Sequence, residues 1–316
     1  MVAEGRGGGR GDGGSGPWPT VYFLSDYGTV DEFVGVVHAV LHAVAPTLTV
    51  IDLSHQVPVF DIAAGAAMLV RAGPYLGAGV VLAVVDPGVG TDRRGVALEV
   101  PAGGPQWLVG PDNGLLLSLA DSLGGVRAAF ALDPVRAGSE RHGRTFDGRD
   151  AFAPAAAHLA LGGHASEIGL RVETATLRPA PDGGRPDRAD PGGEGTGLST
   201  TVTWIDRFGN VQLTARPDAL SAIGVPGGGT ARLTFAPGDG GGGETEGRTV
   251  VARRVRAFGQ LARGEFGLLD DANGLVSVVL DRASASRALG VTGTGVAVRV
   301  RADAGGARPD TRPPGV

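Results

Sequence analysis

The stretch VVLAVVDPGVGTDRRGVALEV, residues 80–100, joins two apolar runs through a glycine-rich turn. The first run, residues 80–85, is short, β-branched and free of polar residues, which is typical of a buried strand. It ends at Asp86, and Arg93 follows after the turn. Ligands bind at the carboxyl edge of open α/β sheets, where a carboxylate and a guanidinium can orient a small polar nucleophile. Taken alone, the pattern favours a strand-capping aspartate with solvated arginines, but the rest of the chain changes that balance.

The segments around this stretch alternate between strand-like and helix-like patterns. Apolar runs predict strands over residues 20–24, 48–53, 80–85, 107–109 and 128–132. Amphipathic or alanine-rich runs predict helices over residues 32–44, 62–71, 115–123 and 153–161, with Asp31 and Asp61 as N-caps of the first two. This order predicts an α/β domain with a central, mostly parallel sheet.

The remaining segments divide the chain into domains. We expect a disordered tail over residues 1–19, the α/β domain over 20–177, a Pro-, Asp- and Gly-rich linker over 178–198, a smaller β domain over 199–303 and a frayed tail over 304–316. Short strands separated by glycine turns predict that the second domain is a small β-barrel or sandwich.

Composition excludes several classes of function. The chain of 316 residues has Cys 0, which excludes disulfides, thiolate catalysis and cysteine metal sites. The net charge of -5 gives no reason to expect a nucleic acid or anionic membrane partner. No apolar run reaches membrane-spanning length, and no secretory signal is recognisable, so we expect a cytoplasmic protein. His38 and His42 have the spacing of a zinc-binding helix, but the sequence shows no third ligand, so we predict no metal site.

Aspartates recur at predicted strand ends beside glycine, at Asp26, Asp86, Asp112 and Asp206. Each one alone is explained by an Asx turn, whereas several on one sheet edge favour a binding site. The chain has no P-loop, no dinucleotide fingerprint and no nucleophilic serine motif.

Six segments in order carry a resemblance to a known family: SDYGTVDEFVGVVHAVL, DLSHQVPVFDIAAGA, VVDPGVGTDRR, GPDNGLL, TFDGRDAFAPAAAHLALG and IDRFGN. The chain resembles the S-adenosylmethionine hydroxide adenosyltransferases, relatives of fluorinase and chlorinase. The resemblance implies an N-terminal α/β domain, a β-barrel-like C-terminal domain and a homotrimer with sites at subunit interfaces. It also implies S-adenosylmethionine as the small-molecule substrate, with no cofactor. By the same resemblance, water is expected to attack C5′ of the ribose, giving adenosine and L-methionine as the products.

The resemblance also assigns site residues. Asp86 and Arg93 match two members of the catalytic set of the hydrolases, and Asp26 matches the residue that holds the ribose hydroxyls. Phe60 occupies the position of a residue that stacks over the adenosine. The residues implied on the methionine and adenine side are Asp206, Phe208, Asn210, Leu280 and Arg282.

One position departs from the family pattern. The hydrolases carry TFHGRD, whereas this chain has Asp147 in place of the histidine, so Asp147 is the expected third catalytic residue. A carboxylate can accept a proton from water, but the substitution equally supports a catalytically silent protein that binds S-adenosylmethionine or adenosine. A halogenase is the weaker alternative, because Asp86 replaces the Tyr of the halogenase turn and would repel a halide.

Overall fold

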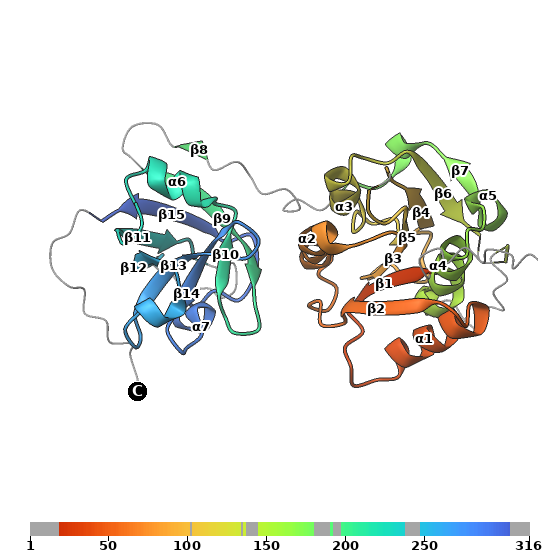
Figure 1. Cartoon of the computed structure of the whole chain (residues 1–316), viewed down its shortest axis with the longest axis horizontal. Coiled ribbons are helices and arrows are strands. Elements are labelled where there is room, and N and C mark those ends of the chain that lie inside the picture. The colour runs from red at the N-terminus through yellow and green to blue at the C-terminus, as the bar shows by residue number, and fades with distance from the viewer. Residues whose placement is uncertain are drawn as a thin grey trace, which may run out of the picture. The chain divides into compact units, whose positions relative to one another are not determined.

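The computed structural model describes residues 19–101, 103–133, 135–136, 145–179, 190–191, 197–237 and 247–303. These residues form two compact units, each with its own sheet (Figure 1). The first unit contains the described residues up to Val59, Tyr75–Asp112 and Leu123–Leu177. The second contains Phe60–Pro74, Asn113–Ser122 and the described residues from Arg178 onward.

The predicted tails and linker fall largely outside the described residues, which exclude 1–18, 180–189, 192–196 and 304–316. Their predicted disorder therefore stays a prediction. Among the described residues, no helix combines the length and apolar character needed to cross a lipid bilayer.

The first unit is built on a seven-stranded sheet in the order β2-β1-β3-β5-β4-β6-β7. Its strands are β1 (Thr20–Ser25), β2 (Thr49–Ser54), β3 (Val80–Val84), β4 (Gly95–Glu99), β5 (Trp107–Pro111), β6 (Ala128–Leu132) and β7 (Gly169–Val172). Strands β2, β1, β3 and β5 are parallel to one another. The pairings β5–β4, β4–β6 and β6–β7 are antiparallel. The predicted α/β domain with a mostly parallel centre is confirmed.

The position of β4 matters for the site. β3 pairs with β5, yet the next strand along the chain, β4, pairs with the other side of β5. The connection over residues 85–94 must therefore cross the carboxyl end of β5. The Asp112 N–H, just beyond β5, donates to the Arg94 carbonyl oxygen at 2.8 Å and fixes this crossing.

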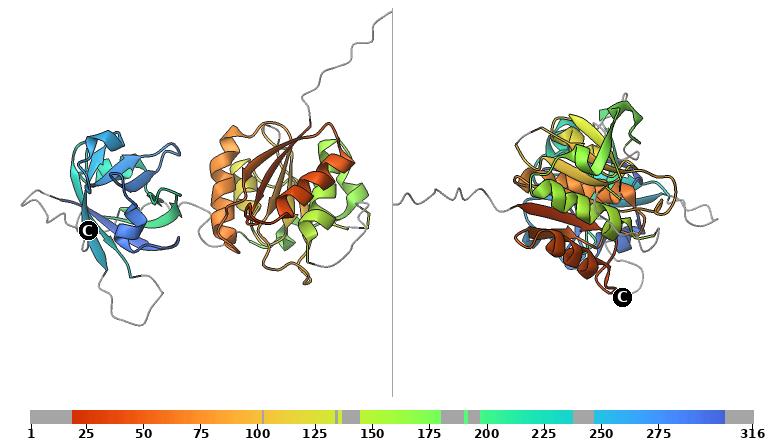
Figure 2. Two further views of the ribbon diagram at one scale, coloured as in Figure 1. Left: turned by 90° about the horizontal axis from the view of Figure 1, so that it is seen from below. Right: turned by 90° about the vertical axis from the view of Figure 1, so that its right-hand side faces the viewer.

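Helices α1 (Phe33–Val44) and α4 (Ala153–Ala160) pack side by side, and α4 contacts β1, β3 and β5 (Figure 2). Small side chains allow the close approach, because Ala155, Ala156 and Ala157 are fully buried. A π-helical turn, η2 (Gly148–Phe152), precedes α4, and α5 (Ala165–Ile168) and the 3-10 turn η3 (Thr174–Thr176) flank β7. The sequence predicted a polar loop up to residue 152; residues 141–144 of it are outside the described residues.

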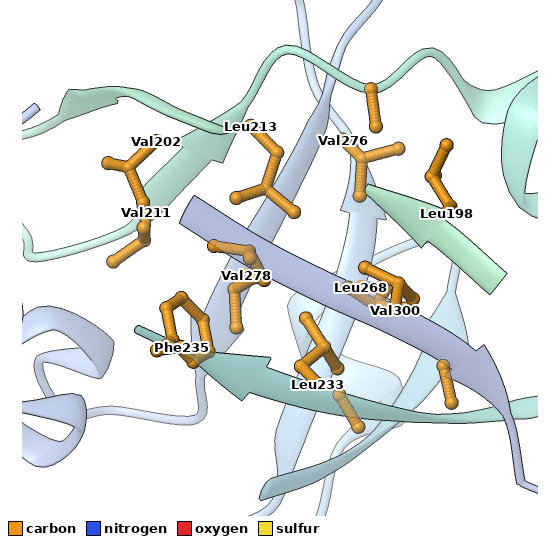
Figure 3. Close-up of a cluster of buried hydrophobic side chains, with 14 of the residues drawn as sticks. Leu198, Val202, Val211, Leu213, Leu233, Phe235, Leu268, Val276, Val278 and Val300 are labelled. Atoms are coloured by element: carbon orange, nitrogen blue, oxygen red, sulfur yellow. The ribbon is translucent and has the colours of Figure 1, made fainter. Parts of the chain in front are cut away.

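The second unit contains a closed barrel of seven strands in the order β10-β14-β13-β12-β11-β15-β9, closed by pairing of β9 with β10. These are β9 (Gly197–Ile205), β10 (Val211–Leu213), β11 (Thr230–Phe235), β12 (Arg248–Val255), β13 (Phe266–Asp270), β14 (Val276–Leu280) and β15 (Ala297–Ala302), with the short β8 (Asp190–Pro191) on the edge of β9. The interior is apolar, with Val202, Leu213, Phe235 and Val278 among its buried residues (Figure 3). The barrel alternative of the prediction is confirmed.

Short helices complete this unit: α6 (Pro217–Ala222), α7 (Ala285–Leu289) and the 3-10 turn η4 (Phe258–Gln260). It also includes α2 (Ile62–Ala72) and α3 (Leu117–Ser122), which pack on each other, and the 3-10 turn η1 (Gly73–Tyr75) follows α2 directly. The predicted cap of α2 is confirmed, since Asp61 Oδ1 accepts the Ala64 N–H at 2.8 Å. The predicted cap of α1 was wrong, because Glu32 occupies that position without a side-chain hydrogen bond.

Candidate active site

The carboxyl ends of β1 and β3 lie side by side and lead into two of the predicted site residues. Ser25 pairs with Val84 in the parallel register, and the Asp26 N–H donates to the Val84 carbonyl oxygen at 3.3 Å. Asp26 and Asp86 therefore follow neighbouring strands at one edge of the sheet. Ligands bind at this edge in α/β sheets.

The loop after Asp86 folds back on itself. The Thr91 N–H and Oγ1 both donate to the Gly88 carbonyl oxygen, at 3.2 and 2.6 Å. Gly90 adopts φ 80°, a left-handed conformation that glycine reaches without strain. The loop returns Arg93 to Asp86, where Nε donates to Oδ1 at 3.1 Å and Nη2 to Oδ2 at 2.5 Å. This two-point contact fixes both side chains.

Arg93 also contacts the third predicted residue. Its Nη2 donates to Asp147 Oδ2 at 2.7 Å, and its guanidinium carbon lies 5.3 Å from the Phe152 ring centroid. The Arg93 and Asp86 side chains are each 5% exposed and that of Asp147 is 12% exposed. Two carboxylates therefore share one buried guanidinium. We call Asp86, Arg93 and Asp147 the carboxylate–arginine cluster.

The second terminal nitrogen of Arg93, Nη1, is buried and has no hydrogen-bond partner among the described residues. An unpaired buried donor costs roughly 1–3 kcal/mol, so such a group calls for a partner such as a ligand, an ordered water or an ion. A water molecule or hydroxide ion is small enough and supplies the acceptor that Nη1 requires. The cluster can thus hold an oxygen nucleophile beside two carboxylates.

Burial raises the pKa of the Asp86 carboxyl. Arg93 opposes this change, and the negative charge of Asp147 adds to it. A carboxylate with a raised pKa is a stronger base, which suits proton abstraction from water. Burial, followed by the charges of Asp26, Asp86 and Asp147, also raises the pKa of Tyr27, so its hydroxyl stays protonated.

Aromatic contacts hold the segment that carries Asp147. The Phe146 ring meets Tyr27 edge-on at 5.7 Å and Phe33 at 5.2 Å between centroids. A Cβ on Gly148 would lie 2.1 Å from the Tyr27 hydroxyl oxygen, so glycine is required there for Tyr27 to approach. Asp147 is fixed from both sides by residues that contact the same tyrosine.

The second unit contains the predicted residues around Asp206. Asp206 Oδ1 accepts the N–H groups of Phe208 and Asn210, both at 2.9 Å, and Oδ2 accepts Asn210 Nδ2 at 2.7 Å. The Gly209 carbonyl oxygen accepts the Ser286 N–H at 2.8 Å. This links the turn to the segment that follows β14. Leu280 is the last residue of β14, and Arg282, two residues further on, adopts φ 52°. Phe208 is 72% exposed.

Phe60 lies at the start of the second unit's Phe60–Pro74 segment. It follows β2, adopts φ 66° and is 66% exposed, directly before the capping residue Asp61. The structure thus presents one buried set around Arg93 in the first unit and one turn around Asp206 in the second. Each set is internally connected.

Sequence reasoning missed the role of Arg94. Its Nε and Nη2 donate to Asp112 Oδ2, at 3.0 and 2.5 Å, and Nη2 also donates to the Thr176 carbonyl oxygen at 2.6 Å. Asp112, which the strand-end pattern grouped with the site, pairs with Arg94 just beyond β5. Tyr27 was also missed, although it stands within the quoted SDYG segment.

Together, the mixed α/β unit, its buried carboxylate–arginine cluster and the seven-stranded barrel define a two-unit class of enzyme with its reactive groups at a sheet edge. The sequence comparison identifies which one. The chain belongs to the SAM hydroxide adenosyltransferase family: the N-terminal domain of that family matches residues 21–169, and the C-terminal domain matches residues 200–297. Both matches coincide with the α/β and barrel parts of the fold.

Curated relatives support this assignment over most of the chain. The (R)-S-adenosyl-L-methionine hydrolase of Salinispora tropica is 43% identical over 276 residues, covering 87% of this chain and 95% of the relative. The hydrolase of the same name from Thermus thermophilus is 42% identical, covering 86% and 95%. The fluorinase of Actinopolyspora mzabensis is 28% identical and covers 66% and 75%. The crystal structure of an uncharacterized conserved protein from Thermotoga maritima matches with TM-score 0.74 and 26% identity, covering 89% and 99%.

Proposed function

We propose that this protein hydrolyses S-adenosyl-L-methionine to adenosine and L-methionine. A water oxygen forms a bond to C5′, the bond from C5′ to sulfur breaks, its electron pair goes to sulfur, and one proton is released. The observation that carries the proposal is the buried Arg93 Nη1, which lacks a partner within a cluster that contains two carboxylates. The names of relatives that match over 95% of their length support the same substrate.

In this proposal Arg93 Nη1 binds the water oxygen and Asp86 accepts its proton. General-base assistance of this kind contributes roughly 10²–10⁴-fold in rate. The sulfonium leaves as a neutral thioether, so no general acid is needed. Positioning of the water and substrate in a dry pocket supplies the rest of the rate acceleration. The negative charge of the cluster also attracts the cationic substrate.

Asp147 orients Arg93 in the same mechanism and provides a second acceptor for the proton. Because a histidine stands at this position in the hydrolases that the chain resembles, Asp147→His is an informative variant. We expect it to remain active to within about tenfold of the parent, since both side chains can accept a proton.

The remaining predicted residues bind substrate. We propose that Asp26 holds the ribose hydroxyls, that Phe60 stacks on the adenosine, and that the residues of the second unit bind the methionine and adenine parts: Asp206, Phe208, Asn210, Leu280 and Arg282. We also propose a homotrimer, in which the barrel of a neighbouring copy completes each site. The exposure of Phe208 supports this arrangement, and light scattering of the purified protein tests it.

The deciding experiment is mass spectrometry after incubation with substrate in ¹⁸O-labelled water. Label in the adenosine 5′-hydroxyl is the expected result. Because the sulfonium is a stereocentre and the relatives are named for the R form, the two epimers are assayed separately and the R form is expected to react. Unchanged substrate together with calorimetric binding would indicate the silent binding protein, and Asp147→His would then be expected to gain activity.

Chloride and fluoride provide a further arm of this experiment. Asp86 places a carboxylate beside the nucleophile position, which disfavours a halide through charge repulsion. Adenosine formation should therefore be independent of halide, and no 5′-halogenated nucleoside should form.

A further inference from the structure

Three metal-ligating side chains meet on the first unit outside the carboxylate–arginine cluster. They are His38 on α1, Asp52 on β2 and His55 just after β2. Asp52 Oδ1 lies 2.9 Å from His38 Nε2 and 3.1 Å from His55 Nε2, and the three ligand atoms all lie within 4.8 Å of one another. Figure 1 shows α1 beside β2, the two elements that supply His38 and Asp52.

His55 is the most informative member of this group. Its side chain is only 6% exposed, and Nδ1 lies 2.8 Å from Ser25 Oγ. Its other nitrogen, Nε2, is buried and has no hydrogen-bond partner in the described part of the chain, because the contact with Asp52 does not have hydrogen-bond geometry. A buried imidazole nitrogen that lies 3.1 Å from a carboxylate oxygen without hydrogen-bond geometry requires another partner.

The surroundings of His55 resemble those of a metal ligand. A metal-bound imidazole usually engages its second nitrogen in a hydrogen bond that fixes the ring, as Ser25 Oγ does here. The ring is also packed against Phe23, with centroids 4.6 Å apart.

We propose that His38 Nε2, Asp52 Oδ1 and His55 Nε2 bind a divalent transition-metal ion, with Zn²⁺ as the expected ion. Tetrahedral zinc bound at 2.0–2.1 Å places its ligand atoms roughly 3.3 Å apart, so the two contacts of Asp52 Oδ1 need to widen only slightly. Two imidazoles and one carboxylate favour zinc over Mg²⁺ or Ca²⁺, which prefer oxygen ligands. The half-exposed His38 and Asp52 leave the outer side open for a water ligand.

The ion would join elements that are distant in sequence. It would tie α1 to β2, and through His55 and Ser25 it would stabilise the end of β1, which leads into Asp26. None of its ligands belongs to the carboxylate–arginine cluster. We therefore expect its main effect on thermal stability, and the site does not depend on the proposed hydrolysis.

The site is tested with the full chain after dialysis against a chelator. Titration with ZnCl₂ in a calorimeter should show one ion bound per chain, and titration with CoCl₂ should give the visible absorption of tetrahedral cobalt. MgCl₂ should give neither signal. His38→Ala and Asp52→Asn should each weaken Zn²⁺ binding by at least about tenfold and abolish the cobalt absorption. Zn²⁺ should raise the unfolding temperature of the parent but not of these variants.

His42→Ala is the matched control, since His42 is exposed and lies one turn further along the same helix. It should bind Zn²⁺ as the parent does. Absence of saturable Zn²⁺ and Co²⁺ binding by the parent would overturn the proposal. Parent-like Zn²⁺ binding by both His38→Ala and Asp52→Asn would also overturn it. So would a loss of Zn²⁺ binding in His42→Ala equal to that in His38→Ala, because this would indicate a site made by the two helix histidines. Circular dichroism of each variant confirms that a loss of binding is not a loss of folding.

Discussion

Gly148 and Tyr27 are in such close contact that a Cβ at position 148 would lie 2.1 Å from the tyrosine hydroxyl oxygen. Tyr27 also packs edge-on against Phe146, the residue before Asp147. The direction in which Asp147 meets Arg93 therefore depends on a glycine that takes no part in the chemistry. Packing of this kind, together with hydrogen bonds, holds a side chain in one geometry.

Gly148→Ala tests this dependence. The added methyl group must displace Tyr27 or the turn that carries Asp147, so we expect a loss of about 1–3 kcal/mol in unfolding free energy and a loss of activity of at least about tenfold. Urea unfolding and kcat/KM measure the two effects. Gly35→Ala is the control, because nothing lies within 4 Å of its Cβ position in α1 and alanine favours the helix. Full activity of Gly148→Ala would show that Asp147 tolerates displacement.

Arg93→Lys tests the shared guanidinium. Lysine keeps the positive charge, but its single ammonium cannot make the two-point contact with Asp86 and also reach Asp147 and a water molecule. We expect kcat/KM to fall by about 100-fold or more while the protein remains folded. Arg94→Lys is the matched comparison, since Arg94 binds Asp112 and Thr176 instead. A larger kinetic loss in Arg94→Lys would contradict the assignment of Arg93 as the residue that holds the nucleophile.

The pH dependence of activity follows from the neighbours of Asp86. Its pKa is raised by burial, with a further contribution from the charge of Asp147. Because the ionised form is the proposed base, activity should rise with pH through this raised pKa. Asp147→Asn removes the negative charge, so the pKa of Asp86 should fall and the acid limb of kcat/KM should move to lower pH. The exposed Asp31→Asn is the control, and an acid limb that does not move in Asp147→Asn would contradict the role of Asp86.

The same raised pKa also affects stability. A carboxyl group with a higher pKa in the folded state contributes its full stabilisation below its unfolded pKa and loses it as pH rises through the folded value. The contribution of Asp86 to the free energy of unfolding should therefore decrease as pH rises from its unfolded pKa through its raised folded pKa. Asp86→Asn should reduce this slope while abolishing the proposed base, which separates the effect on folding from the effect on catalysis.

Local rules explain why the strand-end part of the candidate site was predictable. Asp26 and Asp86 each follow a mostly apolar run, and the parallel pairing of β1 and β3 puts both at one edge. Arg93 is only seven positions from Asp86, within one glycine-bent loop. Asp147 is 54 positions from Arg93, and no periodicity relates the two, so only the ordered family motifs pointed to it.

Tertiary contacts decide the features that were missed. Arg93 and Arg94 are identical neighbours, yet one binds Asp86 and the other Asp112, because successive side chains beside a strand point to opposite sides. His38 drew attention through its spacing to His42, whereas its contact is Asp52 on β2. The helices α6 and α7, with 6 and 5 residues, are too short for a periodic signal.

The barrel turn provides a test that separates binding from chemistry. Asp206 accepts three hydrogen bonds from Phe208 and Asn210, so Asp206→Ala should open the turn that presents these residues. Each lost hydrogen bond is worth about 0.5–1.5 kcal/mol, so the turn should no longer hold Phe208 and Asn210 in position to bind substrate. We therefore expect KM to rise by about tenfold or more, with a smaller change in kcat. Asp218→Ala is the control, because that aspartate is exposed and accepts the N–H of the next residue, Ala219, at 3.0 Å. Loss of an interaction made equally in the ground and transition states alters KM alone. A fall in kcat with unchanged KM would therefore contradict a binding role and place the turn at the reacting atoms.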